Sequence, residues 1–300
     1  MPGTDLRAGL VRIEARIGVA KPLFQHVIVG EGTWLWCDTG IASTPAEALL
    51  GRLPWETAPR HVAVITHADV DHFGGLGQLR RAIPNLVVAS HERDARWIGD
   101  LDAIMAERYL AHVDEGVDVP EPRRQQLRER AGDPVAPDVL LAGGETFDLG
   151  PGGPWRVVPL PGHSPGSIGL WEPASRTALV GDAVLGWGVI DGDGRLSPPP
   201  YGSVADYLST ISVLEDLGIE RLLAAHEPER AGSDVGAWLA ESRAMVRDIG
   251  AAVRAAERFG VTRLPDVCER VGRDVGRWPE ATWLGLADAV AAHRREEATS

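Results

Sequence analysis

The chain has 300 residues, a net charge of −13 and a hydrophobic fraction of 44%, which is enough material for a full hydrophobic core. Its acidic character argues against nucleic acid as a partner, because nucleic-acid binding needs a positive surface that displaces counterions. The sequence has no run of roughly 18 or more apolar residues, so we expect no membrane association. Cys37 and Cys268 are its only two cysteines; we therefore expect no disulfide framework, no cysteine-based zinc site and a cytoplasmic location.

The first part of the chain alternates between strand and helix patterns, which is typical of an α/β fold. β-Branched and aromatic residues predict strands at 10–19, 26–30, 33–40, 61–66 and 85–90. Helices are expected at 45–53, where Pro45 stands in the first turn, and at 75–83.

Residues 91–135 are charged and helical in pattern, so we expect a helical insertion that forms a lid over the site. Short strands separated by Gly and Pro are expected at 139–144, 145–150, 155–160, 167–172 and 177–182. A helix at 204–218 and a strand at 219–226 follow, and the pattern is helical from about 232 onward. These shifts predict a catalytic domain at 1–231 and a C-terminal helical extension at 232–300.

Four loops carry potential metal ligands directly after expected strands. The densest is THADVDHFGG at 66–75, which contains His67, Asp69, Asp71 and His72. Three later loops contain His163, Asp182 and His226. On an extended stretch the side chains of residues 67, 69 and 71 share one face, and imidazole and carboxylate groups are suitable ligands for zinc, iron or manganese. Taken alone, the first cluster could also be a solvated turn, but four such loops favour a metal site.

The order of these motifs resembles the metallo-β-lactamase superfamily, over about residues 11–230. The usual family loop reads His-x-His-x-Asp-His and is followed by a His, an Asp and a His on later loops; the Asp-Thr-Gly at 38–40 is also similar. The resemblance implies an α/β fold, a four-layer αββα sandwich with a two-metal site at one edge of the paired sheets. It implies that one metal is held by His67, Asp69 and His163, that a second is held by Asp71, His72 and His226, and that Asp182 bridges them.

Asp69 departs from the family pattern, because it stands where the second His of the family loop is expected. Three carboxylates and one hydroxide balance two divalent cations, so the site should be less positive and harder than a His-rich one. We therefore expect two divalent ions, with zinc favoured and iron or manganese as alternatives. Some relatives with a Glu at this position are di-iron redox proteins. The alternative that Asp69 does not ligate, and that the loop holds one metal, stays open.

The favoured function is a dinuclear metal-dependent hydrolase that acts on a small-molecule substrate. A metal-bridging hydroxide would attack the carbonyl of a carboxylic ester, lactone or thioester. Asp182 would bridge and orient the ions, while Asp71 would bind its metal and transfer a proton. The alternatives are a non-haem di-iron oxidoreductase or oxygenase on the same fold, and a non-catalytic binding protein.

Three residues are candidates for contact with the substrate. Tyr201 follows three prolines near the loop of Asp182, while Tyr109 and His112 share one helix face in the insertion. Asp38 is expected to serve the turn at the end of its strand and not the chemistry. The C-terminal helices could pack on the sandwich, form a homodimer contact or cap the pocket.

Overall fold

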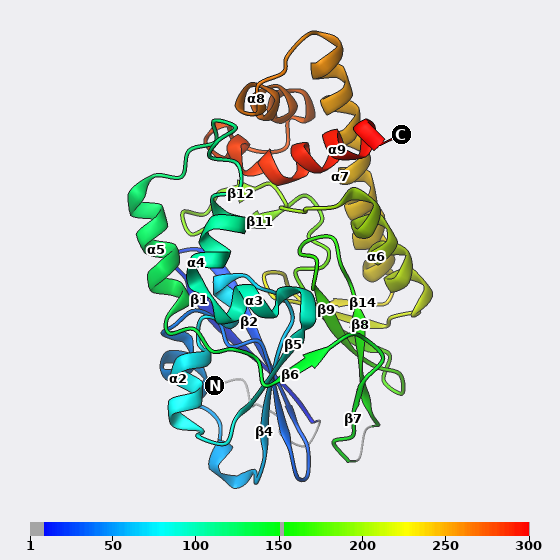
Figure 1. Ribbon diagram of the computed structural model, residues 1–300. Coiled ribbons are helices and arrows are strands. Elements are labelled where there is room, and N and C mark those ends of the chain that lie inside the picture. The colour runs from blue at the N-terminus through cyan, green and yellow to red at the C-terminus, as the bar shows by residue number, and fades with distance from the viewer. Residues whose placement is uncertain (1–8, 151–152, 300) are drawn as a thin grey trace.

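The computed structural model describes residues 9–150 and 153–299, which form two stacked six-stranded sheets with helices on their outer faces (Figure 1). The first sheet has the strand order β1-β2-β3-β4-β5-β6 and the second the order β14-β13-β10-β9-β8-β7. The strands of the first sheet are β1 (Leu10–Ile17), β2 (Lys21–Val29), β3 (Trp34–Cys37), β4 (His61–Ile65), β5 (Val87–His91) and β6 (Val139–Leu141). Those of the second are β7 (Thr146–Phe147), β8 (Trp155–Pro159), β9 (Ile168–Glu172), β10 (Thr177–Gly181), β13 (Arg221–Ala224) and β14 (Arg230–Ala231). A separate ribbon pairs β11 (Val189–Ile190) with β12 (Leu196–Ser197).

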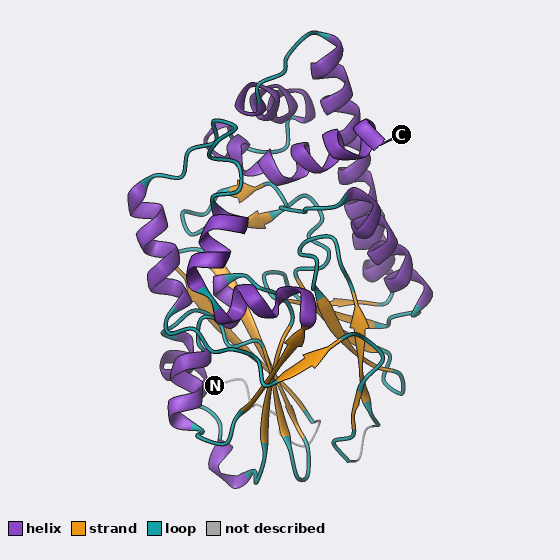
Figure 2. Cartoon of the chain, in the orientation of Figure 1, coloured by secondary structure: helices purple, strands orange, loops and turns teal. Residues whose placement is uncertain are grey.

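Helices cover both outer faces of the paired sheets (Figure 2). The α-helices are α1 (Val70–Phe73), α2 (Leu76–Ala82), α3 (Glu92–Gly99), α4 (Leu101–Ile104), α5 (Glu121–Ala131), α6 (Val204–Asp216), α7 (Ser233–Arg258), α8 (Leu264–Val275) and α9 (Ala287–Thr299). Shorter helical turns are η2 (Pro45–Leu49), η3 (Trp55–Thr57), η4 (Met105–Tyr109) and η5 (Glu280–Leu286). The helix expected at 45–53 is therefore a shorter turn of π-helix.

Alternate residues of the central strands face two different hydrophobic cores, since successive side chains of a strand point to opposite faces. On β3, Leu35 faces the core between the two sheets, whereas Trp34 and Trp36 face the core under the first set of helices. On β10, Leu179 faces the inter-sheet core, and its neighbours Ala178 and Val180 face α6 and α7. Three cores stacked in this way give four layers, which confirms the expected αββα sandwich.

Parallel pairing brings the ligand-bearing loops to one edge of this sandwich. Strands β3 to β6 run parallel to one another, and β10 runs parallel to β13. The carboxyl ends of parallel strands meet at the same edge of a sheet. The loops that leave β4, β10 and β13 carry His67, Asp182 and His226, respectively.

The segment between β5 and β6 is helical, as its composition predicted for 91–135. It contains α3, α4, η4 and α5, and its apolar side chains join the core on the outer face of the first sheet; these include Ile98, Ile104, Met105 and Leu127. The insertion is thus fixed to the sandwich by its own share of the hydrophobic core.

The C-terminal helices share one hydrophobic core with the outer face of the second sheet. Trp238 of α7, Val267 of α8 and Val290 of α9 belong to the same cluster as Val180 of β10. The core is therefore continuous across residue 231, where the sequence predicted a boundary. In Figure 1, α8 and α9 lie beyond the β11–β12 ribbon, at the end of the molecule away from the hairpin turns of the sheets. In the described part of the chain, no helix is long and apolar enough to cross a membrane.

Replacing Leu35 with Ala should lower the free energy of unfolding by about 2–5 kcal/mol, because it leaves a cavity between the two sheets. Leu35 has no exposed surface, whereas Leu140 is 59% exposed. The matched control Leu140→Ala should therefore change the free energy of unfolding by about 0.5 kcal/mol or less. Chemical denaturation of both variants measures the difference, and equal losses would contradict the assignment of Leu35 to the inter-sheet core.

Candidate metal centre

The loop after β4 is held in place by three backbone hydrogen bonds. The backbone N–H groups of residues 66, 68 and 70 donate hydrogen bonds to Asp38 Oδ1 (2.7 Å), Asp94 Oδ2 (2.8 Å) and the Tyr109 hydroxyl (2.9 Å), respectively. Residues 70–73 form the short helix α1, so these bonds hold the turn that leads from β4 into α1. They fix the backbone of the segment that carries His67, Asp69 and Asp71 at the edge of the sandwich.

Six of the predicted ligands gather there in two groups of three, with the potential ligand atoms of each group within 4.8 Å of one another. The groups are His67, His163 and Asp182, and Asp71, His72 and His226. Asp182 also reaches the second group, since its Oδ2 lies 3.6 Å from Nε2 of His72 and 3.3 Å from Nε2 of His226. One carboxylate thus borders both groups, which we call the first and the second subsite.

A glycine permits the close approach of the loop that carries Asp182. Gly181 has a φ of +53°, and a Cβ atom at this position would lie 2.5 Å from Thr66 Oγ1. A side chain here would be both strained and in collision with the loop after β4. The sequence Gly181-Asp182 is therefore needed to bring the two loops together.

Backbone carbonyl groups fix the protonation of two of the imidazoles. Nδ1 of His163 lies 2.9 Å from the carbonyl oxygen of Pro200, and Nδ1 of His226 lies 2.8 Å from that of Pro22. A carbonyl oxygen can only accept a hydrogen bond, so Nδ1 carries the proton in both rings. In the neutral rings, Nε2 is left with its lone pair.

A side-chain relay fixes the other two imidazoles in the same way. Nδ1 of His72 lies 2.8 Å from Oδ2 of Asp38, which also accepts the Thr66 hydroxyl proton at 2.8 Å. Because that proton is already donated, the Thr66 oxygen accepts from Nδ1 of His67 at 3.0 Å. Asp38 therefore orients two ligands, one directly and one through Thr66, as partners of metal-binding histidines commonly do.

The Nε2 lone pairs consequently face carboxylate oxygens. Oδ2 of Asp69 lies 2.9 Å from Nε2 of His163 and 3.4 Å from Nε2 of His67. Oδ2 of Asp71 lies 3.4 Å from Nε2 of His226. Lone pairs facing each other repel unless a cation lies between them, and ligand atoms around one tetrahedral zinc ion, with bonds of about 2.0 Å, lie about 3.3 Å apart. The donor set therefore fits divalent cations.

Unpartnered polar atoms point to the same conclusion. Within the described residues, the buried side-chain atoms without a hydrogen-bond partner include Nε2 of His67, Nε2 of His72, Nε2 of His226 and Oδ1 of Asp182. A buried polar atom without a partner is costly and calls for an explanation. A metal ion in each subsite would supply the missing partner.

The close approach of imidazoles and carboxylates also shifts their pKa values. Burial lowers the pKa of His72, but the carboxylates of Asp182 and Asp38 outweigh it and raise the pKa well above its ordinary value. Burial raises the pKa of Asp182, yet His226 and His72 hold it well below its ordinary value. Both shifts show that the carboxylates around His72 favour positive charge in the second subsite, which a metal ion would supply.

Two basic side chains that the sequence analysis missed also border the site. Arg108 donates from Nε to Oδ1 of Asp69 (2.6 Å) and from Nη2 to Oδ2 (2.8 Å), and Lys21 donates from Nζ to Oδ2 of Asp71 (2.6 Å). Burial raises the pKa of Asp69, but its neighbours, Arg108 above all, hold this pKa well below its ordinary value. The expectation that Asp69 makes the site less positive left out this guanidinium, which cancels the added charge.

Asp94 is a further residue that sequence reasoning missed. Its carboxylate has no exposed surface and accepts hydrogen bonds from the Ala68 amide (2.8 Å), the Ser164 hydroxyl (2.6 Å) and the Gly166 amide (2.8 Å). Asp94 thereby joins the loop of His67 to the loop of His163. It lies in a run of charged residues at the start of the insertion, so nothing in the sequence distinguished it from its neighbours.

The three candidates for substrate contact have partners inside the protein. The Tyr109 hydroxyl donates to Oδ1 of Asp69 at 3.0 Å, which makes it part of the loop anchor. Tyr201 has no exposed surface, and its hydroxyl is 3.0 Å from Nε2 of His293. His112 lies between Glu115 (2.7 Å) and Asp288 (3.0 Å), where it connects the insertion to α9. Tyr201 and His112 thus make packing and connecting contacts inside the protein, and contact of these residues with the substrate stays a prediction.

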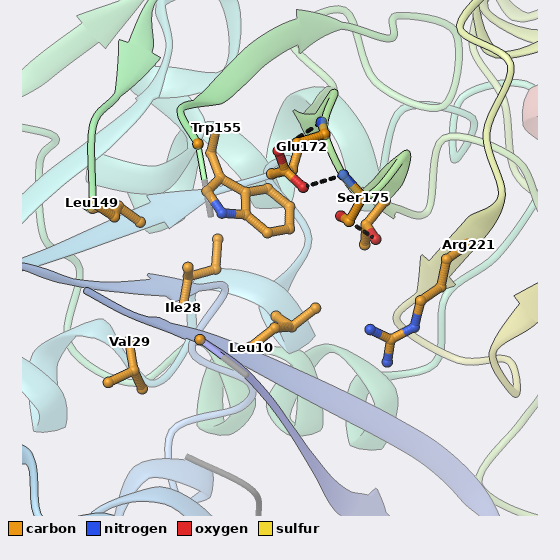
Figure 3. Close-up of a pocket in the computed structure, with 12 residues that line it drawn as sticks. Leu10, Ile28, Val29, Leu149, Trp155, Glu172, Ser175 and Arg221 are labelled. Carbon is orange, nitrogen blue, oxygen red and sulfur yellow. Dashed lines mark hydrogen bonds between the residues drawn. The ribbon is translucent and has the colours of Figure 1, made fainter. Parts of the chain in front are cut away.

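A pocket of about 460 Å³ opens between the sheets at the opposite edge of the sandwich (Figure 3). Leu10, Trp155, Glu172 and Arg221, at the far ends of their strands, help to line it. The buried Glu172 carboxylate already accepts hydrogen bonds from two backbone N–H groups, at residues 174 and 175. We assign this pocket no part in the metal centre.

Comparison with known proteins identifies the family. Residues 24–226 match the model of the metallo-β-lactamase superfamily. The chain therefore belongs to the metallo-β-lactamase superfamily, as the order of its motifs indicated.

Similar proteins support this assignment. The chain is 32% identical over 225 residues to acyl-coenzyme A thioesterase MBLAC2 of Homo sapiens, covering 71% of this chain and 72% of that protein. It is 27% identical over 145 residues to hydroxyacylglutathione hydrolase GloC of Haemophilus influenzae, covering 48% and 59%, respectively. Among solved structures, a metallo-beta-lactamase family protein from Thermus thermophilus has a TM-score of 0.74 at 22% identity, covering 97% of this chain and 94% of that chain. The structural likeness extends over the C-terminal helices as well as the sandwich.

Replacing Asp38 with Asn should weaken metal binding at the second subsite by about 10-fold to 100-fold. The carboxylate accepts the Thr66 backbone N–H at Oδ1 and the proton on Nδ1 of His72 at Oδ2; an amide has one acceptor atom, so it cannot accept from both. Asn tolerates the φ of +64° at this position, so the backbone is preserved. Competition with a chromophoric chelator measures the affinity. The control Asp193→Asn changes a carboxylate that is 75% exposed and should bind metal as the wild type does; equal affinities in the two variants would contradict the relay.

Proposed function

We propose that this metal-dependent hydrolase binds two divalent ions and cleaves thioesters. The proposal rests on one observation. Four imidazole Nε2 atoms face the oxygens of three carboxylates, in two subsites that share Asp182. In the first subsite the ligands would be His67, Asp69 and His163, and in the second Asp71, His72 and His226. Two bound divalent ions supply a hydroxide at neutral pH and polarise the carbonyl group of the substrate.

Asp71 is the proposed proton carrier. Its Oδ2 lies in the second subsite and accepts a hydrogen bond from Lys21 at 2.6 Å. Burial raises the pKa of Asp71, but Lys21 and the neighbouring histidines lower it below its ordinary value, so the carboxylate is ionised. Because its lowered pKa makes it a weak base, the proposed role is a transient one, in which Asp71 takes a proton from the attacking nucleophile and passes it at once to the leaving group.

The helical insertion is the proposed cover of the first subsite. Arg108 and Tyr109 of η4 both reach Asp69. Asp94 of α3 holds the loops that carry His67 and His163. An insertion attached at these points would cover the first subsite on the side of Asp69.

The names of the relatives favour a thioester over the other candidate bonds. The human relative is named an acyl-coenzyme A thioesterase, and the Haemophilus influenzae relative a hydroxyacylglutathione hydrolase. Zinc is the favoured metal because imidazole supplies four of the seven ligands, and iron and manganese are the alternatives.

The zinc-loaded protein should hydrolyse acyl thioesters faster than matched oxyesters, lactones, β-lactams or phosphodiesters, as measured by kcat/KM on a substrate panel. Preference for another bond would contradict the proposed substrate class. A protein purified with iron, with visible absorption and no hydrolysis of the panel, would favour a di-iron oxidoreductase instead.

Replacing Asp71 with Asn should lower kcat by about 100-fold to 10,000-fold, since the amide cannot take up a proton. Metal content is measured alongside, because Asp71 is also a proposed ligand. The exposed Asp114→Asn variant is the control and should retain full activity. A fully loaded Asp71→Asn protein with wild-type kcat would rule out the proton-carrier role.

A further inference from the structure

We propose that Asp69 and Arg108 act as one positioning unit that replaces a single histidine. The guanidinium, carried by the insertion, would direct one oxygen of Asp69 into the first subsite and cancel the charge of the carboxylate. This inference rests on the metal centre proposed above, and Arg108 is a positioning residue in it, not a ligand.

The two oxygens of Asp69 have different surroundings. Oδ1 accepts hydrogen bonds from Nε of Arg108 (2.6 Å) and from the Tyr109 hydroxyl (3.0 Å). Oδ2 accepts one from Nη2 of Arg108 (2.8 Å) and faces Nε2 of His163 at 2.9 Å and Nε2 of His67 at 3.4 Å. Only Oδ2 is directed at the imidazole lone pairs, so the carboxylate is already oriented for one-oxygen ligation.

Arg108 is itself held in place from several directions. Its side chain is 11% exposed, Nη1 donates to the carbonyl oxygen of His163 (3.4 Å), and its guanidinium lies 5.9 Å from the centre of the Trp97 ring. Nη2 lies 3.1 Å from Nε2 of His163, which places the guanidinium directly beside the first subsite. The planar fork matches both carboxylate oxygens at once, which the single ammonium group of Lys cannot do.

Charge explains why the two residues belong together. A neutral histidine at position 69 would add no charge, and the Asp69–Arg108 pair adds none either. Changing Asp69 alone to His leaves a buried guanidinium that has lost its carboxylate and lies beside a site for divalent cations. Such an unpaired buried charge is strongly unfavourable, and it repels the metal. A single change back to the family residue should therefore damage the site, and removal of the guanidinium should repair it.

A double-mutant cycle tests this coupling. Wild type, Asp69→His, Arg108→Met and the double variant are titrated with Zn²⁺ against a chromophoric chelator, and melting of each metal-free protein is followed in parallel. Asp69→His should weaken binding at the first subsite by at least about 10-fold, in the range of outer-shell effects. The double variant should recover most of that loss. Arg96→Met, which removes an exposed arginine of the same insertion that pairs with Glu107, is the matched control and should bind as the wild type does.

The absorption spectrum of the Co²⁺-loaded protein reports the orientation of Asp69 independently of affinity. Arg108→Lys keeps the charge and loses the fork, so its spectrum should differ from that of the wild type, whereas the spectrum of Arg96→Met should not. The comparison of these spectra also tests the positioning role of Arg108 if Asp69→His does not fold.

The outcomes separate this inference from the proposed function. Additive effects in the cycle, or wild-type affinity in Asp69→His, would overturn the positioning unit while the wild type still binds two ions. An unchanged Co²⁺ spectrum in Arg108→Lys would overturn it as well. A wild type that binds no metal would overturn the metal centre and the positioning unit together.

Discussion

The whole site depends on imidazole nitrogen lone pairs that face carboxylate oxygens at one edge of the sandwich. Protein acceptors take the Nδ1 protons of four histidines, and the Nε2 atoms that remain face carboxylate oxygens at 2.9–3.6 Å. No rearrangement of protons among neutral rings removes this opposition, because a carbonyl oxygen such as that of Pro22 or Pro200 cannot donate. Arg108 supplies a donor to Nε2 of His163 (3.1 Å). Cations would supply partners for the buried Nε2 atoms of His67, His72 and His226.

The anchors come from the first sheet, from the insertion and from the loop before α6, so the sandwich and the insertion form one unit around the site. Asp38 follows β3, Pro22 lies on β2, and Asp94 and Tyr109 belong to the insertion. Each fixes a backbone or imidazole N–H group of a loop that carries ligands. Pro200 supplies the fifth anchor, and Tyr201 beside it is held by His293 of α9. The C-terminal helices thus support the first subsite through a loop they do not belong to.

Local patterns of strand and helix predict the α/β fold class, and the resemblance to the metallo-β-lactamase superfamily predicts which ligand loops converge. A strand followed by His67, Asp71 and His72 is recognisable within a short stretch of sequence. Arg108, Lys21 and Asp94 could not be located, because they meet the loop after β4 only through tertiary packing, across 39, 50 and 26 positions of chain. The surroundings of Tyr201 could not be predicted for the same reason: three prolines indicated a stiff segment, and only the packing of α9 shows that the Tyr201 side chain is buried.

Anomalous diffraction from crystals of the metal-loaded protein, recorded at the absorption edge of the metal, tests the metal centre most directly. The account predicts two peaks, one bonded to Nε2 of His67 and His163 and the other to Nε2 of His72 and His226, with Asp182 in contact with both. A single peak would contradict the dinuclear site. Peaks bonded through Nδ1, or located away from these four rings, would contradict the protonation pattern on which the account is built.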